Sequence, residues 1–278
     1  MKRILVPVDF SEHAGFALEV AARLARKYGS EIIVLHMLGL SEAYLTKDET
    51  QEFAEAHYYM KLAKTRVDRF LDQPYLKDVE VREMVQNYKI FSEINQVAAE
   101  QNIDLIVMGS HGTGGLSELF VGSNTEKVVR SSEIPVLVIK TRRPEFDPRK
   151  VVFATDFSLE GIEAYSRIRR LVTLWGSEMC LVYVNLPNEK FRSTREKQET
   201  ADNFMNAAHG GKLPQKTSIR FVSDYTIEGG VYFVAEEIDA DLIAIPTHGR
   251  SGLMHFFKGS LGEDLANHAK FPVISCKM

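Results

Sequence analysis

The chain has 278 residues, a formal net charge of −4 and 26% charged residues. This length exceeds that of a usual single domain and predicts two domains of about 100–150 residues each. The mild negative charge excludes a general attraction to nucleic acid or anionic lipid, so a bound anion would have to be held locally. No apolar span of about 20 residues and no signal-peptide pattern is present, so we expect a cytoplasmic protein with no nucleic-acid or membrane partner.

Strand and helix patterns alternate along the first half of the chain. Short β-branched and apolar runs predict strands over residues 3–8, 31–37, 79–85, 104–108 and 135–140. Helical spacing predicts helices from a cap at Ser11 to a stop at Gly29, from a capping box at 46–49 to Leu71, and over 91–100 and 123–131. Such alternation predicts an α/β fold, with a mainly parallel sheet covered by helices on both faces.

The pattern then restarts, which indicates an internal repeat. VVFATDFS (151–158) corresponds to ILVPVDFS (4–11), and DLIAIPTHGRSGL (241–253) corresponds to DLIVMGSHGTGGL (104–116). The offset falls from 147 to 137 between these segments, so we expect a shorter middle helix in the second copy. We predict a domain over 1–141, a linker over 142–149 and a second domain over 150–278, since the linker residues RRPEFDPR are charged and aperiodic.

A glycine-rich loop follows the fourth predicted strand and precedes a helix. Gly109 ends the strand and Gly112 lies in the loop, and Gly122 and Ser123 open the helix pattern. Glycines let the backbone approach a ligand, and the free N–H groups at a helix start attract anions. The stretch therefore predicts a phosphate site, although a simply capped helix start would be the better explanation of Gly122 and Ser123 if they stood alone.

These residues carry a resemblance to a known family. The strand ILVPVDFS, the strand and loop VMGSHG and the helix start GSNTEKV make the chain similar to a tandem universal stress protein, over nearly all of both halves. The resemblance implies two flavodoxin-like (Rossmann-like) domains, each a five-stranded parallel sheet in the order 3-2-1-4-5. In that family the spacing Gly109-x2-Gly112-x9-Gly122-Ser123 marks members that bind ATP.

The resemblance also implies a set of binding residues. Asp9 would accept hydrogen bonds from the adenine or ribose, at the point where strand order reverses, although a purely structural cap of the turn at Ser11 is the alternative. Met37 would contact adenine through its backbone. The expected nucleotide-binding residues are Pro7, Val8, Asp9, Met37, Met108, Gly109, His111, Gly112, Gly122, Ser123, Asn124 and Thr125.

The second half departs from this motif. Pro246 stands where the first half has Gly109, and Leu261 and Gly262 replace Asn124 and Thr125. Proline has no N–H and its ring occupies space that a ribose would need. We therefore expect ATP in the first domain and weak or absent binding in the second.

The predicted function is an ATP-binding stress-response or regulatory protein, with ADP or AMP as alternative ligands and Mg²⁺ accompanying the phosphates. A slow ATP hydrolase, an autophosphorylating protein using Ser123 or Thr125, and a nucleotide-independent interaction scaffold remain alternatives. No P-loop lysine or arginine finger is recognisable, so we assign no catalytic residue and expect slow hydrolysis at most. The resemblance implies an intramolecular pseudo-dimer through the last strands, leaving a homodimer and an unknown protein partner open.

Histidine and cysteine residues give no further site. His111 follows a small hydroxyl residue, as does His248 in the second half, but no carboxylate is placed to orient either ring, so we interpret them as loop residues. Cys180 and Cys276 lie in apolar strand-like runs and are expected to be buried and unpaired. No HxxxH or CxxC pair is present, so no protein-bound metal is predicted.

Overall fold

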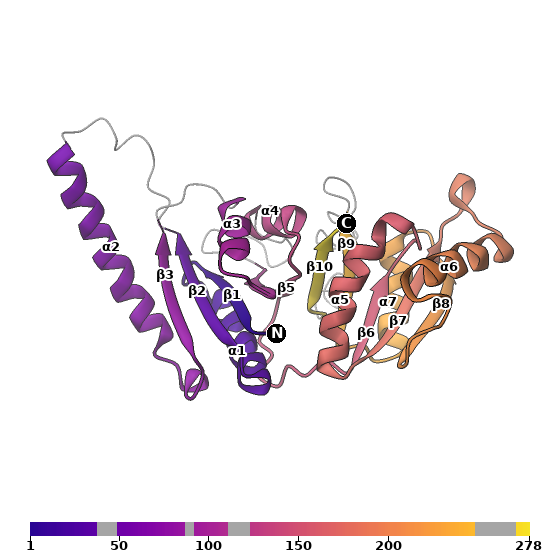
Figure 1. Ribbon diagram of the computed structural model, residues 1–278, viewed down its shortest axis with the longest axis horizontal. Helices are drawn as coiled ribbons and strands as arrows, with labels where there is room; N and C mark the ends of the chain where they lie inside the picture. The colour runs from indigo at the N-terminus through magenta and orange to yellow at the C-terminus, as the bar shows by residue number, and fades with distance from the viewer. Residues whose placement is uncertain (38–48, 87–91, 111–122, 248–270) are drawn as a thin grey trace. The chain divides into compact units, whose positions relative to one another are not determined.

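The computed structural model describes residues 1–37, 49–86, 92–110, 123–247 and 271–278. His111, Gly112 and Gly122, together with the second loop over 248–270, lie outside these residues. The chain divides into two compact units, Met1–Val128 with Val136–Phe146 and Val129–Pro135 with Asp147–Met278. The prediction of two α/β domains is confirmed (Figure 1).

The first unit has a five-stranded parallel sheet in the order β3-β2-β1-β4-β5. Its strands are β1 (Arg3–Val8), β2 (Glu31–Met37), β3 (Val81–Gln86), β4 (Leu105–Gly109) and β5 (Val136–Ile139). Its helices are α1 (Glu12–Tyr28), α2 (Glu49–Leu71), a short 3₁₀ turn η2 (Pro74–Leu76), α3 (Ser92–Glu100) and α4 (Ser123–Ser131).

The second unit repeats this topology in the order β8-β7-β6-β9-β10, and its strands are also parallel. Its strands are β6 (Lys150–Ala154), β7 (Glu178–Asn185), β8 (Thr217–Ser223), β9 (Leu242–Thr247) and β10 (Val273–Lys277). Its helices are η3 (Leu159–Gly161), α5 (Ile162–Trp175), η4 (Asn188–Lys190), α6 (Thr194–His209) and α7 (Ile227–Glu237). As the change in offset predicted, α6 has 16 residues where α2 has 23.

Local capping chemistry sets the ends of the helices. Ser11 accepts a hydrogen bond from Ala14 N and begins α1, and Gly29 ends this helix in the left-handed conformation at φ 64°, as the sequence predicted. Ser193 and Glu196 form a reciprocal capping box on α6. Right-handed crossovers place α5 and α6 on one face of the second sheet and α7 on the other (Figure 1).

The sheets form the centre of each core. The middle strands β4 and β5 are buried along their whole length, which is typical of a parallel sheet covered on both faces. In the second unit an aromatic cluster between the sheet and α6 joins Phe157 to Tyr183, Phe204 and Phe221 at ring-centroid distances of 5.6–6.2 Å. Cys180 and Cys276 are buried and free, as expected.

The predicted linker is anchored to the first unit over part of its length. The Arg142 guanidinium donates two hydrogen bonds of 2.9 Å to the Glu19 carboxylate on α1. Phe146 is 6% exposed, and its carbonyl accepts a hydrogen bond from Arg23. The composition of these residues indicated only a linker. A single buried phenylalanine among charged residues produces no periodic pattern, so its anchoring could not be predicted.

Candidate functional site at the carboxyl edge of the first sheet

The first sheet reverses its strand order between β1 and β4. These parallel neighbours pair Ile4 with Leu105 and Leu5 with Ile106, and the same register brings Val8 opposite Gly109 at their carboxyl ends. Asp9 follows directly and is exposed. In open α/β sheets a ligand lies outside this edge at the reversal, so the fold brings Val8, Asp9 and Gly109 to the expected place.

Asp9 shapes a tight turn between β1 and α1. Its Oδ1 accepts a hydrogen bond of 3.0 Å from Ser11 N, and Phe10 lies between them in the left-handed region at φ 66°. The second unit builds the same turn, with a bond of 2.9 Å from Ser158 N to Asp156 Oδ1 and Phe157 at φ 58°. Asp9 therefore has the structural role that the sequence left as an alternative, and it lies at an exposed edge of the sheet.

A ring cluster beside Asp9 was not predicted from the sequence. The Phe10 ring lies 4.4 Å from the His36 ring and 5.7 Å from the Phe70 ring, measured between centroids. The guanidinium of Arg66, on α2, lies 5.5 Å from the centre of the Phe10 ring. His36 Nδ1 also bonds the Val8 carbonyl at 2.9 Å. These contacts pack the Phe10 ring between the sheet and α2, and they bring the Arg66 guanidinium to the same edge.

Gly109 and Thr125 both have packing roles. A Cβ on Gly109 would lie 2.6–2.8 Å from the backbone C and O and the Cβ of His13, so α1 itself requires a glycine here. The Thr125 hydroxyl is buried and donates a hydrogen bond of 2.9 Å to the Gly109 carbonyl. That donor is occupied, so the Thr125 hydroxyl adds no donor for phosphate in this geometry, unlike its backbone N–H at the start of α4.

The other predicted residues surround the same edge. Met37 ends β2 in a half-buried position, Met108 is 5% exposed on β4, and Pro7 is half-buried on β1. Ser123 begins α4, the helix whose start the sequence placed at this residue, and Asn124 in its first turn is exposed. A helix start with an exposed amide side chain is a suitable place for an anion.

The second unit differs at the corresponding edge. Pro246 is part of β9 and pairs in register with Cys276, and Thr247 after it is 1% exposed. The first helical residues also change, because 159–161 form the 3₁₀ turn η3 before α5, whereas α1 starts directly at Glu12. The second unit therefore differs from the first at two places, at Pro246 and at the start of α5, the helix that corresponds to α1.

The described ranges show neither a cluster of metal-ligating side chains nor a helix that could span a membrane. No group of three or more histidine, cysteine, aspartate or glutamate side chains there is arranged to hold a metal ion. Among the helices placed by the structure, none is both long and apolar enough to span a bilayer.

Comparison with known proteins identifies the lineage of both halves. The model of the Universal stress protein family matches residues 1–140 and again residues 148–277. Universal stress protein MJ0577 of Methanocaldococcus jannaschii is 33% identical over 159 residues, which are 51% of this chain and 96% of the relative. Universal stress protein YxiE of Bacillus subtilis is 27% identical over 146 residues, covering 50% of this chain and 98% of the relative.

Two solved structures match the full length of the chain. A universal stress protein from Archaeoglobus fulgidus aligns with a TM-score of 0.64 at 22% identity, over 99% of this chain and 96% of that one. A putative universal stress protein from Pseudomonas aeruginosa aligns with a TM-score of 0.59 at 17% identity, over 100% and 93%. At this identity the likeness shows the fold.

Proposed function

The chain belongs to the universal stress protein family in both of its halves. We propose that its first domain binds an adenine nucleotide, and that this nucleotide is ATP. The observation that carries this proposal is the edge where β1 and β4 end side by side, with exposed Asp9 and the ring of Phe10 next to it. The start of α4, with exposed Asn124, supplies main-chain donors suited to phosphate.

The described residues fit a nucleotide in their chemistry. Asp9 offers carboxylate oxygens to a ribose hydroxyl or an adenine amine, and Arg66 offers positive charge on the side of α2. Gly109, Met108 and Met37 provide backbone and apolar contact at the strand ends. ATP would bring its own Mg²⁺ on the phosphates.

Substitution of the paired aspartates tests this proposal. Asp9→Asn keeps an oxygen that accepts from Ser11 N but removes the charge, so we expect ATP affinity to fall roughly 10-fold through loss of a charge-assisted hydrogen bond. Asp156→Asn is the matched control, since it occupies the same turn in the second domain and should leave affinity unchanged. Isothermal titration calorimetry measures both.

The stoichiometry of the same titration tests the inequality of the domains. We propose one nucleotide per chain, because Pro246 lacks an N–H and occupies the Gly109 position. Two equal sites per chain would contradict that inequality, and equal affinity in Asp9→Asn and the parent would remove Asp9 from the binding site. Absence of any ATP binding would reject the proposal as a whole.

Two other functions stand beside this one. Autophosphorylation on Thr125 has little support, because its hydroxyl is buried and bonded to Gly109; incubation with γ-labelled ATP followed by peptide mapping would reveal a label on Ser123 or Thr125. A nucleotide-independent scaffold predicts an unchanged melting temperature with ATP. Binding at 100 times Kd should instead add about 2.7 kcal/mol to the free energy of unfolding.

A further inference from the structure

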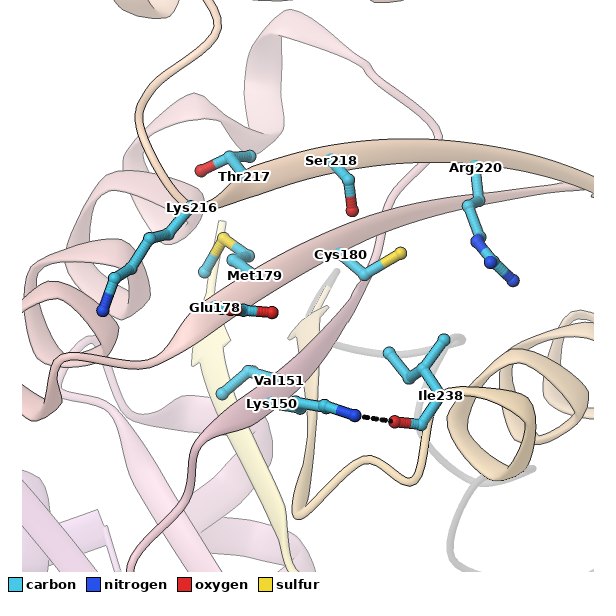
Figure 2. A pocket seen from close by; sticks show the side chains of 10 residues that line it. All are labelled: Lys150, Val151, Glu178, Met179, Cys180, Lys216, Thr217, Ser218, Arg220 and Ile238. Atoms are coloured by element: carbon cyan, nitrogen blue, oxygen red, sulfur yellow. Dashed lines mark hydrogen bonds between the residues drawn. The ribbon is translucent and has the colours of Figure 1, made fainter.

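The second unit contains a cavity at the amino end of its own sheet, at the starts of the strands. It has a volume of ≈ 380 Å³ and lies at the starts of β6, β7 and β8, beside the residue that follows α7 (Figure 2). A Cβ on Gly230 of α7 would contact Val184 and Val222, so even-numbered residues of β7 and β8 face α7. Glu178, Cys180, Ser218 and Arg220 therefore point to the same side of the sheet.

The first unit fills the corresponding space with its own charged side chains. Glu31 accepts hydrogen bonds from Arg3 Nε at 2.9 Å and from Arg82 Nε at 2.8 Å. Gln101 completes the network, since its side chain accepts from Arg82 and its carbonyl accepts from Arg3, both at 2.8 Å. The Arg82 guanidinium thus donates to a carboxylate on one side and to an amide on the other.

The repeat and the strand register show what replaces this network. Lys150 pairs with Glu178 as Arg3 pairs with Glu31, and Cys180 pairs with Ser218 as Ile33 pairs with Arg82. The four network residues Arg3, Glu31, Arg82 and Gln101 thus become Lys150, Glu178, Ser218 and Ile238. The loss of the long arginine at the Ser218 position opens the cavity and leaves the carboxylate without its main partner.

The charges that remain are of both signs. Within the described part of the chain the Glu178 carboxylate has no ion-pair or side-chain hydrogen-bond partner. Lys150 keeps one bond of its counterpart, from Nζ to the Ile238 carbonyl at 2.8 Å, which leaves two ammonium donors. Arg220 pairs with Glu237 at 2.7 Å through one of its five donors. Lys216 turns away and donates to the Gly176 carbonyl.

We propose that this cavity binds a small zwitterion, a molecule with a guanidinium or ammonium group and a carboxylate. The cationic group takes the place that Arg82 holds in the first unit and pairs with Glu178. The carboxylate binds Lys150 and Arg220, and the carbon chain lies against Val151, Cys180 and Ile238. Each charge of the ligand then meets a group of opposite sign, and the net charge of the occupied cavity does not change.

Cys180 provides a direct readout. It lines the cavity and is 6% exposed, whereas Cys276 lies on β10 and is fully buried. Burial raises the pKa of both thiols, so alkylation should be slow and is best followed at alkaline pH. Bound ligand should slow labelling of Cys180, measured by peptide mass spectrometry, while Cys276 reports any general unfolding.

L-arginine is the probe, used with the full chain. We expect saturable protection of Cys180 by L-arginine at millimolar concentration, and weaker protection by agmatine, which lacks the carboxylate, and by succinate, which lacks the cation. Equal protection by agmatine would overturn the role of Lys150 and Arg220, and protection by succinate alone would make the cavity an anion site. No protection by L-arginine would overturn the proposal.

Two variants test the residue assignment. Ser218→Arg restores the residue of the first unit, so it should fill the cavity, pair with Glu178 and abolish binding without loss of thermal stability. Glu178→Gln should weaken binding roughly 10- to 100-fold through loss of a charge-assisted bond. L-arginine affinity unchanged in Glu178→Gln would overturn the proposal, even if Ser218→Arg failed to fold.

Discussion

Replacing Gly109 with alanine should destabilise the first domain by about 3 kcal/mol, at the upper end of the usual cost of overpacking. The new Cβ would lie 2.6 Å from the backbone C of His13 and 2.7 Å from its O. Main-chain atoms of a buried helix cannot rotate away, so α1 would have to move from β4. Urea denaturation at pH 7 should show that the first domain of the variant unfolds at a lower urea concentration than that of the parent.

Gly15 provides the control for this substitution. It lies on the same helix, but a Cβ there meets nothing within 4 Å. Because alanine favours a helix over glycine by about 1 kcal/mol, Gly15→Ala should raise the stability of the first domain. If both variants unfolded at the parent's urea concentration, close packing of α1 against Gly109 would be contradicted.

The second large effect is expected at Glu31. Two arginines bind its carboxylate, and its side chain is only 17% exposed, so Glu31→Gln should lower the free energy of unfolding by about 1.5–3 kcal/mol at pH 7. The hydrogen bond from Arg82 is the main cause that lowers the pKa of Glu31, with Arg3 acting in the same direction.

The lowered pKa of Glu31 determines how its contribution to stability depends on pH. A carboxylate with a lowered pKa in the folded state stabilises fully above its unfolded pKa, and the stabilisation is lost as pH falls through the folded value. Urea midpoints of the parent and Glu31→Gln should therefore differ at pH 7 and converge in acid. Glu178→Gln, the matched substitution at an exposed carboxylate, should change stability by about 0.5 kcal/mol or less. A constant difference at every pH would contradict the ion-pair explanation.

The sequence predicted the architecture well because its signals are local. The Ser11 cap, the Gly29 stop and the start of α4 at Ser123 all depend on neighbouring residues, and the structure has each of them. The internal repeat then predicted the fold of the second domain from that of the first. The order of the strands came from the family resemblance and is confirmed.

The remainder depends on contacts between distant segments. The approach of Arg66 and Phe70 to Phe10 requires α2 to be placed over the sheet, which no spacing in the sequence reveals. The packing role of Gly109 could not be predicted either. A glycine that makes room for a ligand and a glycine that makes room for His13 look identical in sequence. The sequence did not match Ser218 to Arg82, because the offset between the repeats changes from 147 to 137 in this part of the chain. The strand register sets the offset at 136 for these two residues.

The left-handed phenylalanine after the first strand of each repeat bears on how the two copies diverged. Such a conformation is costly for a large side chain, yet Phe10 and Phe157 both keep it, with the same aspartate bond across the turn. The backbone turn alone is a sufficient reason for both repeats to have this Asp-Phe-Ser tripeptide. The aspartate therefore does not distinguish the two repeats as nucleotide sites, and the positions that can are those where the sequence differs, Gly109, Asn124 and Thr125.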